Sequence, residues 1–106
     1  MFTSDAYQDQ FVNKILNGKR DGYFIDIGSC GAIASNNTYF FESLGWKGIC
    51  VEIDSQYTPT YQSRQCVFIN EDATKINYES VFQSHNVPST VDYLSLDIDE
   101  NSTTVL

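Results

Sequence analysis

Four short apolar runs, separated by helix-like stretches, constrain the fold of this chain more than any other feature of its sequence. The runs cover residues 23–27, 48–53, 66–69 and 91–98 and are rich in aromatic and β-branched side chains. Helices are expected over residues 5–18, 37–44 and 77–85, with a weaker helical turn over 59–64. This alternation predicts an α/β fold with a Rossmann-like parallel sheet and crossover helices. The runs are almost continuously apolar, as in a sheet that is covered on both faces.

Capping signals mark the ends of two expected helices. Asp5, with Gln8 as its capping-box partner, is expected to cap the first helix, and Gly18 to end it. Asn77 is expected to cap the last helix. His85, the single histidine, falls near the end of that helix, which favours a helix-end role over that of a catalytic base.

Length and charge restrict the classes of protein to which the chain can belong. Its 106 residues are enough for one domain, residues 1–106. Fourteen Asp and Glu against six Lys and Arg give a formal net charge of −8, and the cations form no basic run, so nucleic acid is not an expected partner. The first residues do not resemble a signal peptide, and no apolar run is long enough to cross a membrane, so no membrane partner is expected either.

The cysteines and the last residues lead to further expectations. Cys30, Cys50 and Cys66 are odd in number and lack the spacing of a zinc site, so buried free thiols in a reducing, cytoplasmic compartment are expected. The apolar pattern continues to Leu106 without a stop signal, so the domain is expected to be incomplete. The exposed edge of an unfinished sheet would favour a homo-oligomer.

The first apolar run ends in the pattern D-x-G-x-x-G, from Asp26 to Gly31. Ligands of open parallel sheets bind beyond the carboxyl ends of the strands, where this loop is expected. Gly28 and Gly31 allow a tight turn and a close approach of the backbone to a ligand. Asp26 replaces the first glycine of the dinucleotide fingerprint, and a carboxylate there suits a ligand with a cationic group, such as a methionine amino group. The alternative is that Asp26 caps the next helix, and the motif alone does not decide between the two.

Acidic side chains also follow the second and third runs. Glu52 follows the glycine loop at close to the offset, roughly twenty residues, at which a carboxylate binds ribose hydroxyls in dinucleotide sites. A solvated acid at the strand end is the alternative. Asp72, beside the small Ala73, suits the exocyclic amine of adenine, although turn formation explains an acid there equally well.

Two further carboxylates, Asp97 and Asp99, lie at the end of the last run. If the strand continues, alternation places them on the same side, where they could bind a divalent cation or act as a base toward a hydroxyl. In the alternative, Asp97 faces the cofactor and Asp99 caps the next helix.

Together these segments resemble the FkbM-type methyltransferases. The resemblance is carried by residues 22–31, by Ser35-Asn36-Asn37-Thr38-Tyr39, by residues 45–52 from Gly45-Trp46 to Glu52, and by residues 92–97. It covers the chain from about Gln8 onward and implies a class I, Rossmann-like fold that transfers a methyl group from S-adenosylmethionine, usually to a hydroxyl oxygen. The sequence departs from the family in an additional asparagine, Asn36-Asn37, and in Asp99-Glu100-Asn101 after Asp97. Family members also have more strands than the four expected here.

The resemblance implies a role for each motif residue. Carried over by position, the S-adenosylmethionine ligands are Asp26, Gly28, Ser29, Gly31, Glu52, Ile53, Asp72 and Ala73, and the catalytic residue is Asp97. The expected methyl acceptor is a hydroxyl of a small molecule or glycan, and a divalent cation at Asp97 and Asp99 is a further expectation. The alternative function is a catalytically inactive nucleotide-binding or interaction module with the same fold. A nicotinamide oxidoreductase is disfavoured because the dinucleotide fingerprint is missing.

Overall fold

A single parallel sheet organises the computed structural model, which describes residues 2–4, 7–33 and 36–96. Its strands are β1 (Tyr23–Ile27), β2 (Lys47–Val51), β3 (Val67–Ile69) and β4 (Tyr93–Leu96), in the order β3-β2-β1-β4. Every neighbouring pair runs parallel. The chain order reverses between β1 and β4, as at the switch point of Rossmann-like sheets. The predicted Rossmann-like α/β fold is confirmed.

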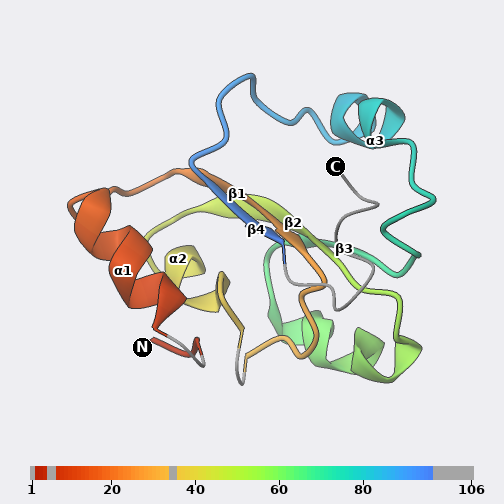
Figure 1. The fold of residues 1–106 in the computed structure, drawn as a ribbon, viewed down its shortest axis with the longest axis horizontal. Coiled ribbons are helices and arrows are strands. Elements are labelled where there is room, and N and C mark those ends of the chain that lie inside the picture. Colours follow the sequence, from red (N-terminus) through yellow and green to blue (C-terminus); the bar gives the residue numbers. More distant parts are fainter. Residues whose placement is uncertain (1, 5–6, 34–35, 97–106) are drawn as a thin grey trace.

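Helices cover both faces of this sheet. α1 (Gln8–Ile15) and α2 (Tyr39–Glu42) lie on one side of the strands, and α3 (Tyr78–Ser84) lies on the other (Figure 1). A 3-10 helix, η1 (Ser55–Ser63), connects β2 to β3. Within the described residues, no helix has the length and apolar character needed to span a bilayer.

The core consists of two clusters because successive strand residues point to opposite faces. One cluster, on the side of α1 and α2, consists of Phe24, Ala32, Phe41, Trp46, Cys50 and Tyr61. The other, on the side of α3, consists of Ile25, Ile27, Ile49, Val51 and Ala73. Each apolar run therefore contributes side chains to both clusters. Because both faces of the strands are buried, the runs are continuously apolar and do not alternate between apolar and polar residues.

The glycine–tryptophan segment before β2 has a packing role. Trp46 is 1% exposed, and its indole nitrogen donates to the Lys19 carbonyl oxygen at 2.8 Å. A Cβ atom at Gly22 would lie 2.6 Å from the Trp46 ring, so only glycine fits beneath the indole. Gly48 lies against the Phe24 ring in the same way. These residues of the resemblance therefore pack the amino ends of β1 and β2.

The ends of the helices differ from the sequence-based expectations. α1 begins at Gln8 after Tyr7, whose φ is 63°, and the expected cap Asp5 lies outside the described residues. Asp9, fully buried, instead accepts hydrogen bonds from the amides of Thr3 and Ser4 at 2.6 and 3.1 Å. The predicted cap Asn77 is confirmed, since its side chain accepts from the Ser80 amide at 3.1 Å.

The bounds of other elements also differ from those expected: β4 begins at Tyr93 rather than residue 91, and β3 begins at Val67 rather than residue 66. β2 ends at Val51 rather than residue 53, and α2 is shorter than the expected helix over 37–44. The expected turn over 59–64 lies within the longer η1 except for Arg64, and η1 begins earlier because Asp54 caps it by accepting from the Gln56 amide. These differences place Glu52 and Ile53 in the connection after β2, not within the strand.

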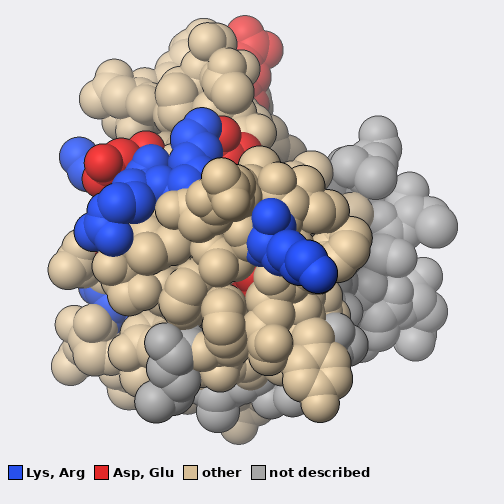
Figure 2. Space-filling model, turned by 90° about the vertical axis from the view of Figure 1, so that its left-hand side faces the viewer, with Lys and Arg blue, Asp and Glu red and all other residues tan. Residues whose placement is uncertain are grey.

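Basic side chains on the α1 side of the molecule do not form one continuous surface. Figure 2 shows them in separate groups, with acidic side chains beside one group. Lys14, Lys19, Arg20 and Lys47 are exposed, whereas the side chain of Arg64 is 0% exposed. The separation on this face agrees with the scattered cations of the sequence.

Candidate functional site

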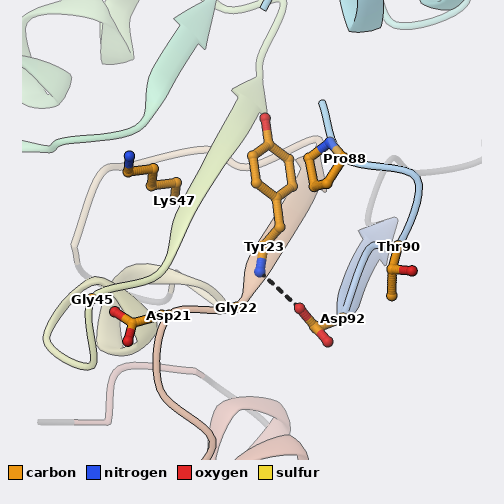
Figure 3. A pocket seen from close by; sticks show the side chains of 8 residues that line it. All are labelled: Asp21, Gly22, Tyr23, Gly45, Lys47, Pro88, Thr90 and Asp92. Atoms are coloured by element: carbon orange, nitrogen blue, oxygen red, sulfur yellow. Dashed lines mark hydrogen bonds between the residues drawn. The ribbon is translucent and has the colours of Figure 1, made fainter. Parts of the chain in front are cut away.

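A cavity of about 430 Å³ opens at the amino edge of the sheet, away from the predicted ligand site. Its lining includes Tyr23 and Lys47, the first residues of β1 and β2, and Asp92, which directly precedes β4 (Figure 3). The polar groups of Asp92 already have partners, because it accepts from the Tyr23 amide at 2.9 Å and from Lys19 Nζ at 2.6 Å. Ligands of such sheets bind at the opposite, carboxyl edge, so the candidate site is built there.

At the carboxyl edge, the loop after β1 is joined to the end of β2. The amides of Gly28 and Ser29 both donate to the Val51 carbonyl oxygen, at 2.8 and 3.1 Å. The next amide, that of Cys30, donates to Glu52 Oε1 at 2.8 Å. Gly28 has a φ of 75° and Cys30 a φ of 56°, so the loop turns through two left-handed residues within three positions. The D-x-G-x-x-G segment is thus a fixed turn whose shape depends on Val51 and Glu52.

The other predicted loop residues face the interior of this turn. Ser29 is 5% exposed, and its Oγ lies 2.6 Å from the Tyr61 hydroxyl. The Gly31 carbonyl oxygen accepts from Asn36 Nδ2 at 2.9 Å. Burial raises the pKa of the Tyr61 hydroxyl, so this group remains a neutral hydrogen-bonding partner.

Asp26 is buried beneath the loop. It is 1% exposed, and its Oδ2 accepts from the Thr38 hydroxyl at 2.8 Å. Thr38 is the residue that precedes α2. This contact is the kind expected if Asp26 fixes the start of the next helix, which was the alternative reading of the motif. Its use as a ligand of the cofactor stays a prediction.

Glu52 lies where the loops after β1 and β2 meet. It is 7% exposed; Oε1 accepts from the Cys30 amide and Oε2 from the Asp54 amide at 2.9 Å. A carboxylate has about four acceptor positions, so each oxygen retains capacity for a ligand hydroxyl. The next residue, Ile53, is 63% exposed although its side chain is apolar. An acid followed by an exposed apolar side chain is suited to a nucleoside, whose ribose is polar and whose base is flat and apolar.

The loop after β3 lies beside these residues. Asn70 Nδ2 donates to the carbonyl oxygens of Glu52 and Ile53 at 2.8 and 3.2 Å, so the structure brings the second and third strand ends together. Asp72 Oδ1 accepts from the Thr74 hydroxyl and amide at 2.7 and 2.9 Å, and these bonds lower the pKa of Asp72. The side chain therefore forms the turn that the alternative reading required. Ala73 is 7% exposed and belongs to the core cluster on the α3 side.

Asp97 and Asp99 lie outside the described residues, so their predicted roles in catalysis and metal binding stay predictions. Elsewhere in the described parts of the chain, no three His, Cys, Asp or Glu side chains are close enough together to hold a metal ion. His85 is exposed and lies at the carboxyl end of α3, as expected.

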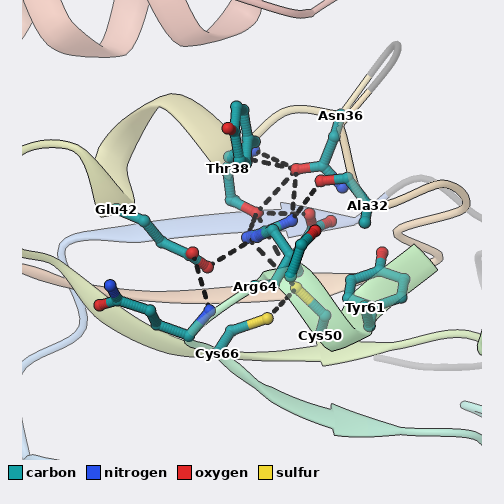
Figure 4. Close-up of polar contacts among 12 residues, drawn as sticks. Ala32, Asn36, Thr38, Glu42, Cys50, Tyr61, Arg64 and Cys66 are labelled. Atoms are coloured by element: carbon teal, nitrogen blue, oxygen red, sulfur yellow. Dashed lines mark hydrogen bonds and ion pairs between the residues drawn. The ribbon is translucent and has the colours of Figure 1, made fainter. Parts of the chain in front are cut away.

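Arg64, which directly follows η1, is a central residue that the sequence did not reveal. Its buried guanidinium forms an ion pair with Glu42 at 2.7 Å and donates to the Ala32 carbonyl oxygen at 2.7 Å (Figure 4). It also lies within 3.3 Å of both Asn36 Oδ1 and Thr38 Oγ1. Its charge is 5.5 to 5.8 Å from the ring centroids of Tyr39, Tyr61 and Phe24. Arg64 thus holds the far end of the loop after β1 against the start of α2.

The charge of Arg64 is retained although the residue is buried. Burial by itself lowers its pKa, but the neighbouring thiols of Cys50 and Cys66 and the Glu42 carboxylate raise it, and the net direction is upward. The sequence gives no sign of this role for Arg64, which ends a segment predicted as a weak helical turn. Each of its partners comes from a distant segment.

Asn36 is the second residue that sequence reasoning underestimated. Its Oδ1 accepts from the amides of Thr38 and Tyr39, both at 2.9 Å, and its Nδ2 donates to the Ser29 carbonyl oxygen at 3.1 Å. Asn37 has a different partner, since its Nδ2 donates to Ser95 Oγ at 3.0 Å. The two asparagines therefore have separate tasks: Asn36 orders the loop and the start of α2, and Asn37 joins the loop to β4. Asparagine just before a helix is a capping signal that could have identified Asn36.

Comparison of the chain with protein-family models, with curated proteins and with solved structures yields no match in any of the three. The resemblance to FkbM-type methyltransferases therefore depends on the motif residues alone. What the structure adds is the confirmed fold and the proximity of three strand ends at one edge.

Proposed function

We propose that the chain binds S-adenosylmethionine at the carboxyl edge of the sheet and belongs to a methyltransferase that modifies a hydroxyl group of a small molecule or glycan. The observation that carries this proposal is the contact between the Cys30 amide and Glu52. It places the acid after β2 directly beside the glycine loop after β1, as a nucleoside site in this fold requires.

The hydrogen-bonding state of the loop supports a ligand without phosphate. Loops that bind pyrophosphate present free backbone amides to it. Here the amides of Gly28, Ser29 and Cys30 donate to Val51 and Glu52, and that of Ala32 lies 3.2 Å from Thr60 Oγ1. These four amides are therefore committed to protein acceptors, which disfavours NAD and ATP.

The charge of the edge supports a cationic ligand. Glu52, Asp54 and Asp72 all follow β2 or β3, and the chain has a formal net charge of −8. Negative side chains at a binding edge attract a sulfonium or ammonium group and repel a phosphate. S-adenosylmethionine carries a sulfonium and an ammonium group and no phosphate, so a negatively charged edge suits it.

Three elements would hold the cofactor in this proposal. Glu52 would accept hydrogen bonds from the ribose hydroxyls with its remaining lone pairs, and the exposed Ile53 would pack against the adenine. The turn at Gly28 would pass close to the methionine part. Asp26 and Arg64 would act as positioning residues, since both are buried and act through the loop.

When bound, the cofactor supplies an electrophilic methyl group on its sulfonium. The protein then needs to place the acceptor hydroxyl in line with it and to remove a proton. Asp97, the residue after β4, is proposed for the second task. Asp97→Asn in a catalytically active form of the protein is expected to lower methyl transfer by about two orders of magnitude with little effect on cofactor affinity.

The choice of ligand can be tested by thermal unfolding with a panel of nucleotides. Because a ligand that binds the folded state raises its stability, S-adenosylmethionine and S-adenosylhomocysteine are expected to raise the melting temperature, whereas NAD and ATP leave it unchanged. Stabilisation by NAD or ATP alone would contradict the proposal. A methyl-transfer assay against hydroxyl acceptors then separates an enzyme from an inactive binding module.

A further inference from the structure

Two thiols, one buried and one partly exposed, lie in contact between β2 and the residue before β3. Cys66 Sγ donates a hydrogen bond to Cys50 Sγ at 3.4 Å (Figure 4). Cys50 is 0% exposed, whereas Cys66 is partly exposed. The third cysteine, Cys30, is exposed and lies in the loop after β1, so the expectation of buried thiols is wrong for Cys30 and correct only for Cys50.

The pair is part of the polar cluster around Arg64. Arg64 Nη2 is 3.8 Å from Cys50 Sγ, and the Thr38 hydroxyl is 4.0 Å from the same sulfur. A guanidinium beside a thiol favours the thiolate, the form that reacts with oxidants. Burial opposes this effect and raises the pKa of the Cys50 thiol overall. The partly exposed Cys66 is therefore the thiol that an oxidant in solution meets first.

We propose that Cys50 and Cys66 are a modification site at which a peroxide produces a reversible disulfide. A disulfide requires the sulfurs to approach to about 2.0 Å, a shift that side-chain rotation of two thiols already in contact can provide. The disulfide would join β2 to the chain just before β3 and close a loop that contains η1. This inference is independent of S-adenosylmethionine binding.

The chemistry needs one peroxide molecule for each disulfide. The Cys66 thiolate attacks a peroxide oxygen, the O–O bond breaks, and the departing hydroxide takes up the proton that Cys66 released, giving water and a sulfenic acid on Cys66. Cys50 sulfur then attacks Cys66 sulfur, the S–O bond breaks, and hydroxide leaves with the Cys50 proton as a second water. Two thiols are oxidised, and the peroxide is reduced to two waters.

The disulfide would also change the surroundings of Arg64. Movement of Cys50 Sγ toward Cys66 alters the contacts of this sulfur with Arg64 and Thr38, which hold the loop after β1. Oxidation of the pair is thus transmitted to the candidate site through residues already in contact.

Peptide mapping after oxidation tests the proposal directly. The whole chain is treated with hydrogen peroxide, quenched in acid, alkylated and digested with trypsin without reduction. Cleavage after Lys47, Arg64 and Lys75 separates Cys50, in peptide 48–64, from Cys66, in peptide 65–75, so only a disulfide joins them. The joined pair is expected to exceed any product linked through Cys30 by more than about tenfold, because thiols in contact react intramolecularly.

Two variants provide the controls. The joined peptides are expected to persist in Cys30→Ser, to disappear in Cys66→Ser, and to be separated by a dithiol reductant in the unmutated chain. Recovery of both peptides in alkylated form after peroxide treatment, with oxidation confined to the exposed Cys30, would overturn the proposal. So would a cross-link that requires Cys30.

Discussion

Arg64 shows at the scale of one residue how the candidate site depends on a buried charge. Its guanidinium is paired with Glu42, whose side chain is only 8% exposed, and it also bonds to Ala32, Asn36 and Thr38. Most of its polar partners belong to the loop after β1 or to α2, and Cys50 Sγ of β2 lies 3.8 Å from Nη2. Removing the arginine would therefore leave a buried carboxylate and several acceptors without their donor.

Arg64→Met is expected to lower the free energy of unfolding by about 3–5 kcal/mol, the usual result of breaking a buried ion pair from one side. Urea denaturation measures this loss. The double variant Arg64→Met/Glu42→Met is the matched control, since it removes both charges, and it should be more stable than Arg64→Met alone. A loss below about 1 kcal/mol in Arg64→Met would show that the cluster contributes little.

Gly28 offers a second test at the residue scale. Its φ of 75° is unfavourable for any residue with a Cβ atom, so Gly28→Ala is expected to cost about 1–2 kcal/mol of stability. Gly18 is the matched control: its φ is 69°, and a Cβ there meets nothing within 4 Å. Both variants should lose similar stability in urea, but only Gly28→Ala should weaken S-adenosylmethionine binding in calorimetry. Equal affinities in the two variants would place the ligand elsewhere.

Among the elements of the fold, β4 is joined to β1 by a charged contact at the amino end of β4. Asp92 precedes β4 and accepts from the Tyr23 amide of β1 and from Lys19 Nζ. The hydrogen bond from Lys19, followed by that from the Tyr23 amide, lowers the pKa of Asp92, although burial acts in the opposite direction. A carboxyl group whose pKa is lower in the folded state stabilises the fold above its ordinary pKa and loses this effect in acid.

Asp92→Asn is accordingly expected to reduce stability at pH 7 by on the order of 1 kcal/mol. The difference from the unmutated protein should shrink as the pH falls below about 4, because the ordinary carboxyl is then protonated in the unfolded chain. Urea denaturation at pH 7 and across the acid range measures the difference. A loss of stability that is the same at every pH would contradict this account of the contact.

The elements also show how far sequence patterns reach. β1 was predicted with its observed ends, since residues 23–27 are bounded by glycines on both sides. β2 was predicted too long because the apolar Ile53 follows Glu52, although Glu52 turns its side chain to the amides of Cys30 and Asp54. Helix starts were less predictable: Asn77 caps through a local bond, but α1 is fixed through the buried Asp9. A cap that bonds within its own turn leaves a sequence signal, whereas bonds to distant segments, such as those of Arg64 to Ala32 and Glu42, leave almost none.

For the molecule as a whole, the same distinction separates the predicted parts of the site from the missed ones. The positions of Gly28, Glu52 and Asp72 at one edge follow from the order of parallel strands, which the sequence predicts. The role of Arg64 depends on oxygen acceptors that lie 22 to 32 residues away along the chain. Asn36, in contrast, bonds mainly to the nearby amides of Thr38 and Tyr39 and was missed although its capping signal is local. The cavity at the amino edge has no counterpart in any motif. The strand order thus predicts the edge of the sheet at which the site lies, while the side-chain contacts that shape the site are seen only in the structure.

Calorimetric titration of S-adenosylmethionine into the chain measures whether the carboxyl edge of the sheet binds this cofactor. We expect saturable binding at one site, weakened by about tenfold or more in Glu52→Gln, since loss of one charged acceptor beside the ribose costs about 1–3 kcal/mol. Glu71→Gln, which changes an exposed acid after β3 in the same way, should bind as the unmutated chain does. Absence of binding at millimolar S-adenosylmethionine, or equal affinity in Glu52→Gln and the unmutated chain, would contradict the account.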